Sequence, residues 1–154
     1  MLTLLEPKRQ MASTEFYFQR ALIIDDSEID VLVNRRLMQL TNFVSDVMIS
    51  GTGEEALRIL REECTKPDYA PDWIFLDMHL PMMSGYDFIE EFKTLPDFIR
   101  ERSKIIVLSV FNKPDALKKI FENTFVAGQL EKPLTQQALL DIAHKKSVGI
   151  LSSF

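Results

Sequence analysis

The sequence predicts an α/β fold in which a parallel, five-stranded sheet is covered by helices on both faces. Five short apolar runs recur along the chain, and the segments between them carry apolar residues at helical spacing. Four of the five runs are nearly continuous, which is typical of strands buried on both faces. Strict alternation of strands and helices calls for right-handed crossovers and therefore favours a mainly parallel, doubly wound sheet.

The five predicted strands are Leu22–Ile24, Phe43–Ile49, Trp73–Leu76, Ile105–Leu108 and Phe125–Ala127. Only the second mixes polar residues, Ser45 and Asp46, into its apolar run. We therefore expect this strand at an edge of the sheet.

Each predicted helix is identified by an apolar stripe with a period near 3.6 residues. The stripes are Ile29, Leu32, Val33, Leu37 and Leu40; Ala56, Leu57, Leu60 and Cys64; Phe88, Ile89 and Phe92; Leu117, Ile120 and Phe121; and Leu139, Ile142 and Ala143. Ser27 can cap the first helix, and Thr52 with Glu55 has the pattern of a capping box before the second. Residues 95–103 are predicted to be a long polar connection.

Length and composition limit the classes of protein to consider. The 154 residues suit one domain, which we predict over residues 20–146, between an N-terminal extension at 1–19 and a C-terminal tail at 147–154. The net charge of -5 argues against general nucleic-acid binding. No apolar run approaches the roughly 18 residues that span a bilayer, and the N-terminus lacks the order of a secretory signal. A cytoplasmic protein without a membrane partner is therefore expected.

Polar residues that can carry chemistry follow four of the predicted strands. They are Asp25 and Asp26 after the first strand, Asp77 after the third, Ser109 after the fourth and Lys132 after the fifth. The carboxyl ends of parallel strands share one edge of a sheet, where such folds bind ligands. Clustered carboxylates repel one another unless a cation or a proton is present, and a few carboxylate oxygens suit Mg²⁺. A hydroxyl and an ammonium can bind further oxygens, and an Asp carboxylate can itself be a nucleophile.

Four motifs in order resemble those of the response-regulator receiver family, also called CheY-like. They are Ile23–Ser27, which is similar to the family's acidic pair; Asp77–Gly85, similar to its phosphoacceptor loop; Leu108–Ser109; and Glu131–Leu134, similar to its Lys-Pro signature. The likeness runs from about residue 20 to 146. It implies a flavodoxin-like three-layer sandwich.

The resemblance also implies a role for each of these residues. Asp77 would accept the phosphoryl group, and Ser109 and Lys132 would contact its oxygens. The residues implied to hold Mg²⁺ or Mn²⁺ are Asp26, Asp77, the backbone carbonyl of His79 and, through water, Asp25. A cis peptide is expected at Lys132–Pro133, because a bond before proline tolerates this form best.

A function in two-component phosphorelay signalling follows from the same resemblance. The chain would be a stand-alone response regulator that is phosphorylated by a histidine kinase or a histidine phosphotransfer protein. It would act on an unknown downstream protein through contacts. It would not be an enzyme beyond catalysing its own phosphorylation and dephosphorylation.

Three positions depart from the family or stand out within its pattern. The family usually has Tyr or Phe three residues before the lysine, where this chain has Gln129, so a rotating buried ring cannot report phosphorylation here. The residues implied to flank the attacking water are His79 and Phe111, both large. We expect them to shield the phosphorylated state, although a neutral histidine could instead act as a base.

Other interpretations of the same residues stay open at this point. A pseudo-receiver that only binds proteins is compatible with Gln129. Residues Gly51–Ala56 fit a loose dinucleotide-binding pattern, but they follow the second strand, and Glu54 and Glu55 would repel a pyrophosphate. A phosphohydrolase with an aspartyl-phosphate intermediate would need a second Asp where His79 stands.

Overall fold

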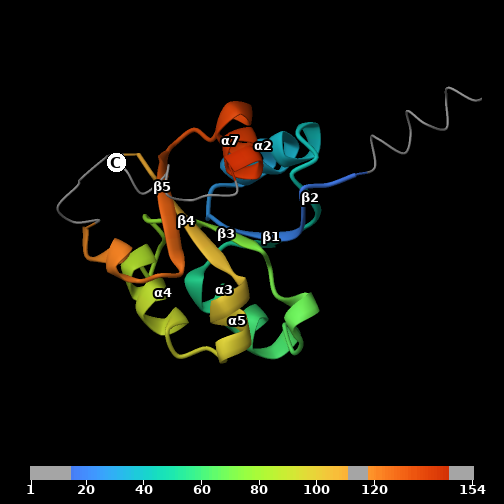
Figure 1. Cartoon of the computed structure of the whole chain (residues 1–154). Coiled ribbons are helices and arrows are strands. Elements are labelled where there is room, and N and C mark those ends of the chain that lie inside the picture. Colours follow the sequence, from blue (N-terminus) through green and yellow to red (C-terminus); the bar gives the residue numbers. More distant parts are fainter. Residues whose placement is uncertain (1–14, 111–117, 146–154) are drawn as a thin grey trace, which may run out of the picture.

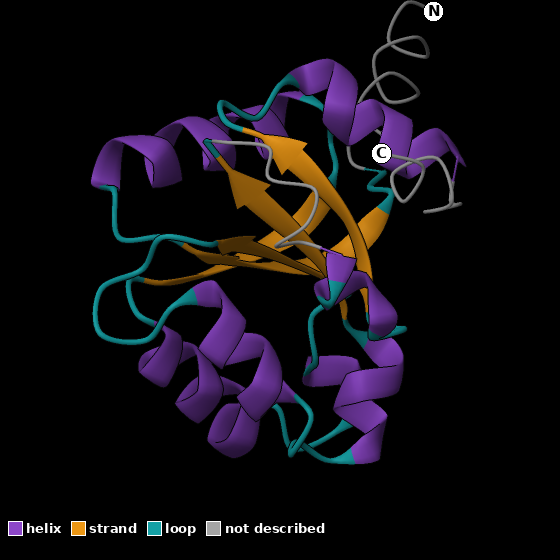
Figure 2. Cartoon of the chain, turned by 90° about the vertical axis from the view of Figure 1, so that its left-hand side faces the viewer, coloured by secondary structure: helices purple, strands orange, loops and turns teal. Residues whose placement is uncertain are grey.

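The computed structural model describes residues 15–110 and 118–145, which form a three-layer α/β sandwich around one sheet (Figures 1 and 2). The five strands are β1 (Phe18–Ile24), β2 (Val44–Ser50), β3 (Trp73–Asp77), β4 (Lys104–Ser109) and β5 (Val126–Glu131). All neighbouring strands are parallel, in the order β2-β1-β3-β4-β5. The predicted fold class is confirmed, and the polar second strand lies at an edge as expected.

Helices cover both faces of the sheet. Helices α2 (Glu28–Leu40) and α7 (Gln136–Lys145) lie on one face, and α3 (Gly53–Arg58), α4 (Gly85–Phe92) and α5 (Asp97–Arg102) lie on the other (Figure 1). The shorter elements are a π-helical turn, η1 (Ile59–Glu63), and two 3₁₀ turns, η2 (Pro67–Tyr69) and η3 (Ile120–Glu122). None of the helices in the described ranges is both long and apolar enough to cross a membrane.

Two hydrophobic cores fill the space between the sheet and its helix layers. The core under α2 and α7 contains a chain of aromatic side chains in edge-to-face contact. The ring centroid of Phe18 lies 5.6 Å from Trp73 and 5.1 Å from Phe43, which in turn lies 5.9 Å from Phe75. Such contacts add to the area that these side chains bury. The core under α3 and α4 includes Cys64, which is buried as its apolar neighbours suggested.

The first helix turns a different face to the sheet than its apolar stripe suggests. Ile29 and Leu32 are 73% and 69% exposed, whereas Asn34 and Met38 are buried. The face turned to the core carries the buried Asn34 and Met38 and the partly buried Val31, at the i, i+3 and i+7 spacing of one helix face. Of the predicted stripe, only Leu37 packs against the core, and Ile29, Leu32, Val33 and Leu40 form an exposed apolar surface on α2.

The segment before the fourth strand is also more ordered than predicted. The expected polar connection contains α5, which begins after Pro96 and buries Ile99 completely. Ile99, together with Leu95 just before the helix, belongs to the core under α3 and α4. Of the stripe predicted over 117–121, Leu117 lies outside the described residues, and Ile120 is buried in η3.

Candidate metal and phosphoacceptor site

Two adjacent carboxylates, Asp25 and Asp26, follow β1 at the carboxyl edge of the sheet. The backbone amide of Asp25 donates to the carbonyl of Ser50, so the strand pairing with β2 continues into the site. The backbone amide of Ser27 donates to Asp25 Oδ1 at 2.9 Å, and the Ser27 side chain caps α2 as predicted. As a result, Asp25 is buried while Asp26 is exposed at the mouth of the site.

The third carboxylate, Asp77, is the last residue of the fully buried strand β3. The backbone amide of His79 donates to Asp77 Oδ1 at 3.0 Å. The amide of the intervening Met78 donates to the carbonyl of Leu108, which ties the start of this loop to β4. One carboxylate oxygen of Asp77 is thus oriented by the backbone, while Oδ2 faces Lys132.

The loop after Asp77 returns to the sheet through a close backbone contact at Gly85. Ser84 and Asp87 form a reciprocal capping box that starts α4, and the Gly85 amide donates to the carbonyl of Met78. A Cβ on Gly85 would lie only 2.9 Å from Met78 Cα, so a residue without a side chain is required here. The contact between Gly85 and Met78 therefore fixes the backbone directly after Asp77.

The fourth and fifth strands bring Ser109 and Lys132 to the same edge. Ser109 ends β4 and is buried, and its carbonyl accepts from the backbone amide of Lys132 at 3.0 Å. The Lys132–Pro133 peptide is cis, as expected. The Lys132 ammonium lies 3.2 Å from Asp25 Oδ2 and 3.4 Å from Asp77 Oδ2.

One further carboxylate, Asp30, contacts the same ammonium at 2.9 Å, the shortest of the three distances. No role for Asp30 is predicted from the sequence. Its position one helical turn after the Asp25–Ser27 motif could have indicated it, because the first turn of a helix capped by Ser27 must pass the same edge of the sheet.

Asp25 and Lys132 each affect the pKa of the other. Burial raises the pKa of Asp25 above its usual value, although the Ser27 amide and Lys132 oppose the change. Burial alone would lower the pKa of Lys132, but the hydrogen bond to Asp30 and the charges of Asp77 and Asp25 outweigh it and raise this pKa. Lys132 is therefore a protonated cation at neutral pH.

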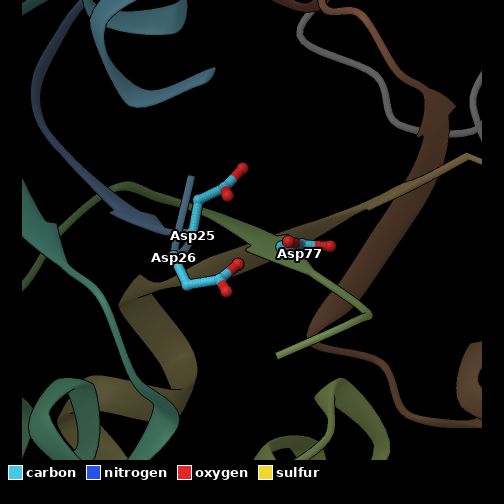
Figure 3. Close-up of side chains that lie close together, drawn as sticks. All are labelled: Asp25, Asp26 and Asp77. Carbon is cyan, nitrogen blue, oxygen red and sulfur yellow. The ribbon is translucent and has the colours of Figure 1, made fainter. Parts of the chain in front are cut away.

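The three carboxylates fit a divalent cation. Asp25, Asp26 and Asp77 each offer an oxygen, and these atoms lie within 4.8 Å of one another. Figure 3 shows Asp25 and Asp26 at the end of β1, both directed toward the side on which Asp77 lies. Asp25 Oδ2 is buried and has no hydrogen-bond partner. It lies within ion-pair distance of Lys132, but without the geometry of a hydrogen bond. Hard carboxylate oxygens in this arrangement suit Mg²⁺ or Mn²⁺.

The pattern Gly51–Ala56 has a structural explanation other than nucleotide binding. A Cβ on Gly53 would lie 2.7 Å from the sulfur of Met83, so this glycine allows the loop after Asp77 to pack against α3. The Thr52 side chain accepts from the Glu55 amide as an N-cap. Gly53 thus serves packing, and Thr52 serves capping.

A doubly wound sheet with an acidic pocket at its carboxyl edge defines the class of protein. Residues 21–144 match the family description "Response regulator receiver domain", and the chain belongs to this family. The match covers nearly the whole chain. Members of the family are not conventional enzymes.

Individual relatives agree with this assignment. Two-component response regulator 24 of Arabidopsis thaliana is 31% identical over 125 residues, which are 81% of this chain and 81% of that protein. The Sensory/regulatory protein RpfC of Xanthomonas campestris pv. campestris is 28% identical over 122 residues, or 79% of this chain, and the chain spans only 16% of its length. A solved two-component response regulator from Cytophaga hutchinsonii has a TM-score of 0.75 at 26% identity, covering 82% of this chain and 95% of that one.

Proposed function

We propose that this chain is a response regulator that accepts a phosphoryl group on Asp77 and passes the signal on through protein contacts. The observation that carries the proposal is the position of Asp77, buried at the end of β3, with one oxygen held by the His79 amide and the other facing Lys132. A carboxylate oriented in this way is suited to act as a nucleophile toward phosphorus.

A divalent cation would complete this site. We propose that Asp26, Asp77 and the backbone carbonyl of His79 hold Mg²⁺ or Mn²⁺, with Asp25 acting through water. The bound cation would neutralise charge on the phosphoryl oxygens. The fit rests on the proximity of the three carboxylate groups.

The chain's own residues would supply positioning and charge. Asp77 Oδ2 would attack phosphorus while the His79 amide keeps Oδ1 oriented. Lys132 and the Ser109 hydroxyl would contact phosphoryl oxygens, since both lie at the adjacent strand ends. Phosphoryl transfer depends mainly on such positioning and electrostatic stabilisation.

The phosphoryl donor would be a histidine kinase or a histidine phosphotransfer protein. Receiver domains are associated with histidine kinases. The exposed apolar surface of α2 starts directly beside the site and includes Ile29, Leu32 and Val33. Exposed apolar side chains of this kind mark contact surfaces, which supports docking of the donor here.

Intact mass measurement after incubation with acetyl phosphate tests the proposal. With Mg²⁺ the protein should gain the mass of one phosphoryl group, and the gain should be lost with EDTA. Asp77→Asn should abolish the gain, and Asp26→Asn should raise the Mg²⁺ concentration it requires. The control Asp68→Asn removes an exposed carboxylate outside the site and should be labelled like the native protein.

The alternative is a pseudo-receiver that only binds proteins. It is favoured by Gln129, which is buried at the usual aromatic position with its Nε2 atom lacking a hydrogen-bond partner. Absence of any mass gain with Mg²⁺ would support this alternative, and undiminished labelling of Asp77→Asn would refute the assignment of the phosphoacceptor.

A further inference from the structure

Lys132 is surrounded by more carboxylates than its proposed contact with a phosphoryl group requires. Its ammonium carries three donor hydrogens, and carboxylate oxygens of Asp25, Asp30 and Asp77 lie at ion-pair distances of 3.2, 2.9 and 3.4 Å from it. The nearest of them, Asp30, does not belong to the acidic triad that fits a cation. One donor of Lys132 is therefore committed to a group outside the reaction.

Helix α2 fixes Asp30 in this position. The backbone amide of Asp30 donates to the hydroxyl of its N-cap, Ser27, at 3.2 Å. The amide of Ser27 in turn donates to Asp25 Oδ1. Two successive hydrogen bonds thus connect the backbone at Asp30 with a buried carboxylate of the site.

Stabilisation of the helix alone does not explain the contact. An acidic residue in the first turn interacts favourably with the helix dipole, and both Glu28 and Asp30 can do so. Of these two residues, Asp30 is the one that contacts Lys132, and its side chain is 42% exposed. It therefore keeps much of its hydration while it holds the ammonium, which limits the cost of desolvation.

We propose that Asp30 is a positioning residue that restrains Lys132 and thereby slows the phosphorylation of Asp77. The inference rests on the proposed function. During transfer from acetyl phosphate, the bond between phosphorus and the acetyl oxygen breaks, acetate leaves with the electron pair, and a bond forms between phosphorus and Asp77 Oδ2. A Lys132 donor held by Asp30 cannot stabilise a phosphoryl oxygen during this step, and the Asp30 charge offsets that of the ammonium.

The test compares Asp30→Asn with the matched variant Glu28→Gln in the full chain. Both changes remove one negative charge from the first turn of α2. The loss of electrostatic repulsion toward an anionic phosphoryl donor is therefore the same in the two variants. The rate of mass gain with acetyl phosphate at saturating Mg²⁺ should be about two- to fivefold higher for Asp30→Asn than for Glu28→Gln, as expected for a partly exposed ion pair. Asp30→Ala should behave like Asp30→Asn.

Two further measurements separate positioning from a structural effect. The Mg²⁺ affinity from an NMR titration should be equal in Asp30→Asn and Glu28→Gln, because Lys132 is no metal ligand. The ¹⁵N resonance of the Lys132 ammonium should shift in Asp30→Asn and stay in place in Glu28→Gln.

The outcomes distinguish this inference from the proposed function. If the native protein is labelled on Asp77 but Asp30→Asn reacts no faster than Glu28→Gln, the restraint is refuted and the phosphoacceptor stands. A slower reaction of Asp30→Asn would show that Asp30 assists Lys132 instead. Failure to label the native protein would overturn the proposed function itself.

Discussion

At the scale of single residues, Asp25 is a buried carboxylate whose charge works against folding. Burial raises its pKa from the usual 3.8, so the carboxyl group ionises at lower pH in the unfolded chain than in the folded one. Its contribution to stability is therefore lost as the pH rises above about 4, and the loss is complete once the folded form has also ionised. A bound cation would offset this cost.

We expect Asp25→Asn to raise the midpoint of thermal unfolding by a few degrees in EDTA at pH 7. The amide can still accept from Ser27, while the buried charge is gone. The gain over the native protein should shrink toward pH 4, and Mg²⁺ should stabilise the native protein more than the variant. Scanning calorimetry in both buffers measures these differences.

The exposed Asp46 provides the control for this prediction. It pairs with Arg20 far from the site, and such pairs contribute little to stability. Asp46→Asn should therefore change the midpoint slightly and equally with and without Mg²⁺. A lower midpoint for Asp25→Asn in EDTA would mean that its pairing with Lys132 outweighs the cost of burial.

The side chain of His79 is exposed beside the proposed phosphoacceptor Asp77, and the His79 backbone amide donates to the Asp77 carboxylate. A change of the side chain leaves that hydrogen bond in place. If the ring shields an acyl phosphate from water, His79→Ala should shorten the lifetime of the phosphorylated protein by up to about one order of magnitude. The decay of the added mass after removal of acetyl phosphate measures this lifetime.

His79→Phe distinguishes shielding from base catalysis. Phenylalanine keeps the bulk but cannot accept a proton, so under shielding its lifetime should match that of the native protein. Slower decay in both variants would identify His79 as a base. The second predicted shielding residue, Phe111, lies outside the described residues.

At the scale of elements, the start of α4 depends on the close approach of Gly85 to Met78. Gly85→Ala should lower the free energy of unfolding by about 1–3 kcal/mol, because the backbone of Met78 must move to admit a methyl group. The displacement would reach Asp77, the preceding residue, so phosphorylation should also slow. Urea denaturation and the labelling rate measure the two effects.

Gly51→Ala is the matched control. No atom lies within 4 Å of the position that its Cβ would take. The change should leave stability within about 0.5 kcal/mol of the native value and phosphorylation unchanged. Equal effects of the two substitutions would contradict the role given to the close contact at Gly85.

Element identity could be predicted from the sequence more reliably than element orientation. Continuous apolar runs identified the strands because both faces of a central strand are buried. For α2 the apolar stripe predicted the wrong face for all its residues except Leu37, because the core side includes the polar Asn34. Helix α5 could not be predicted from an apolar stripe, because Ile99 is the one fully buried side chain among its six residues.

At the scale of the whole molecule, the edge that carries the site followed from topology. Parallel strands end together, so Asp25, Asp77 and Lys132 are expected at one place from the order of elements alone, and the observed distances agree. The contact between Asp30 and Lys132 could not be predicted in this way, because it depends on how α2 is rotated about its axis and on the conformation of the long Lys132 side chain.

The position of the single tryptophan determines what its intrinsic fluorescence can report. Trp73 begins β3 and Asp77 ends it, so the backbone positions of the tryptophan and of the proposed phosphoacceptor are about 13 Å apart along the strand. It is buried against Phe18 at the opposite end of the sheet. Its emission should therefore stay nearly constant when a cation or a phosphoryl group binds, and change when the chain unfolds. Intrinsic fluorescence should therefore report unfolding of the chain without interference from binding at the site.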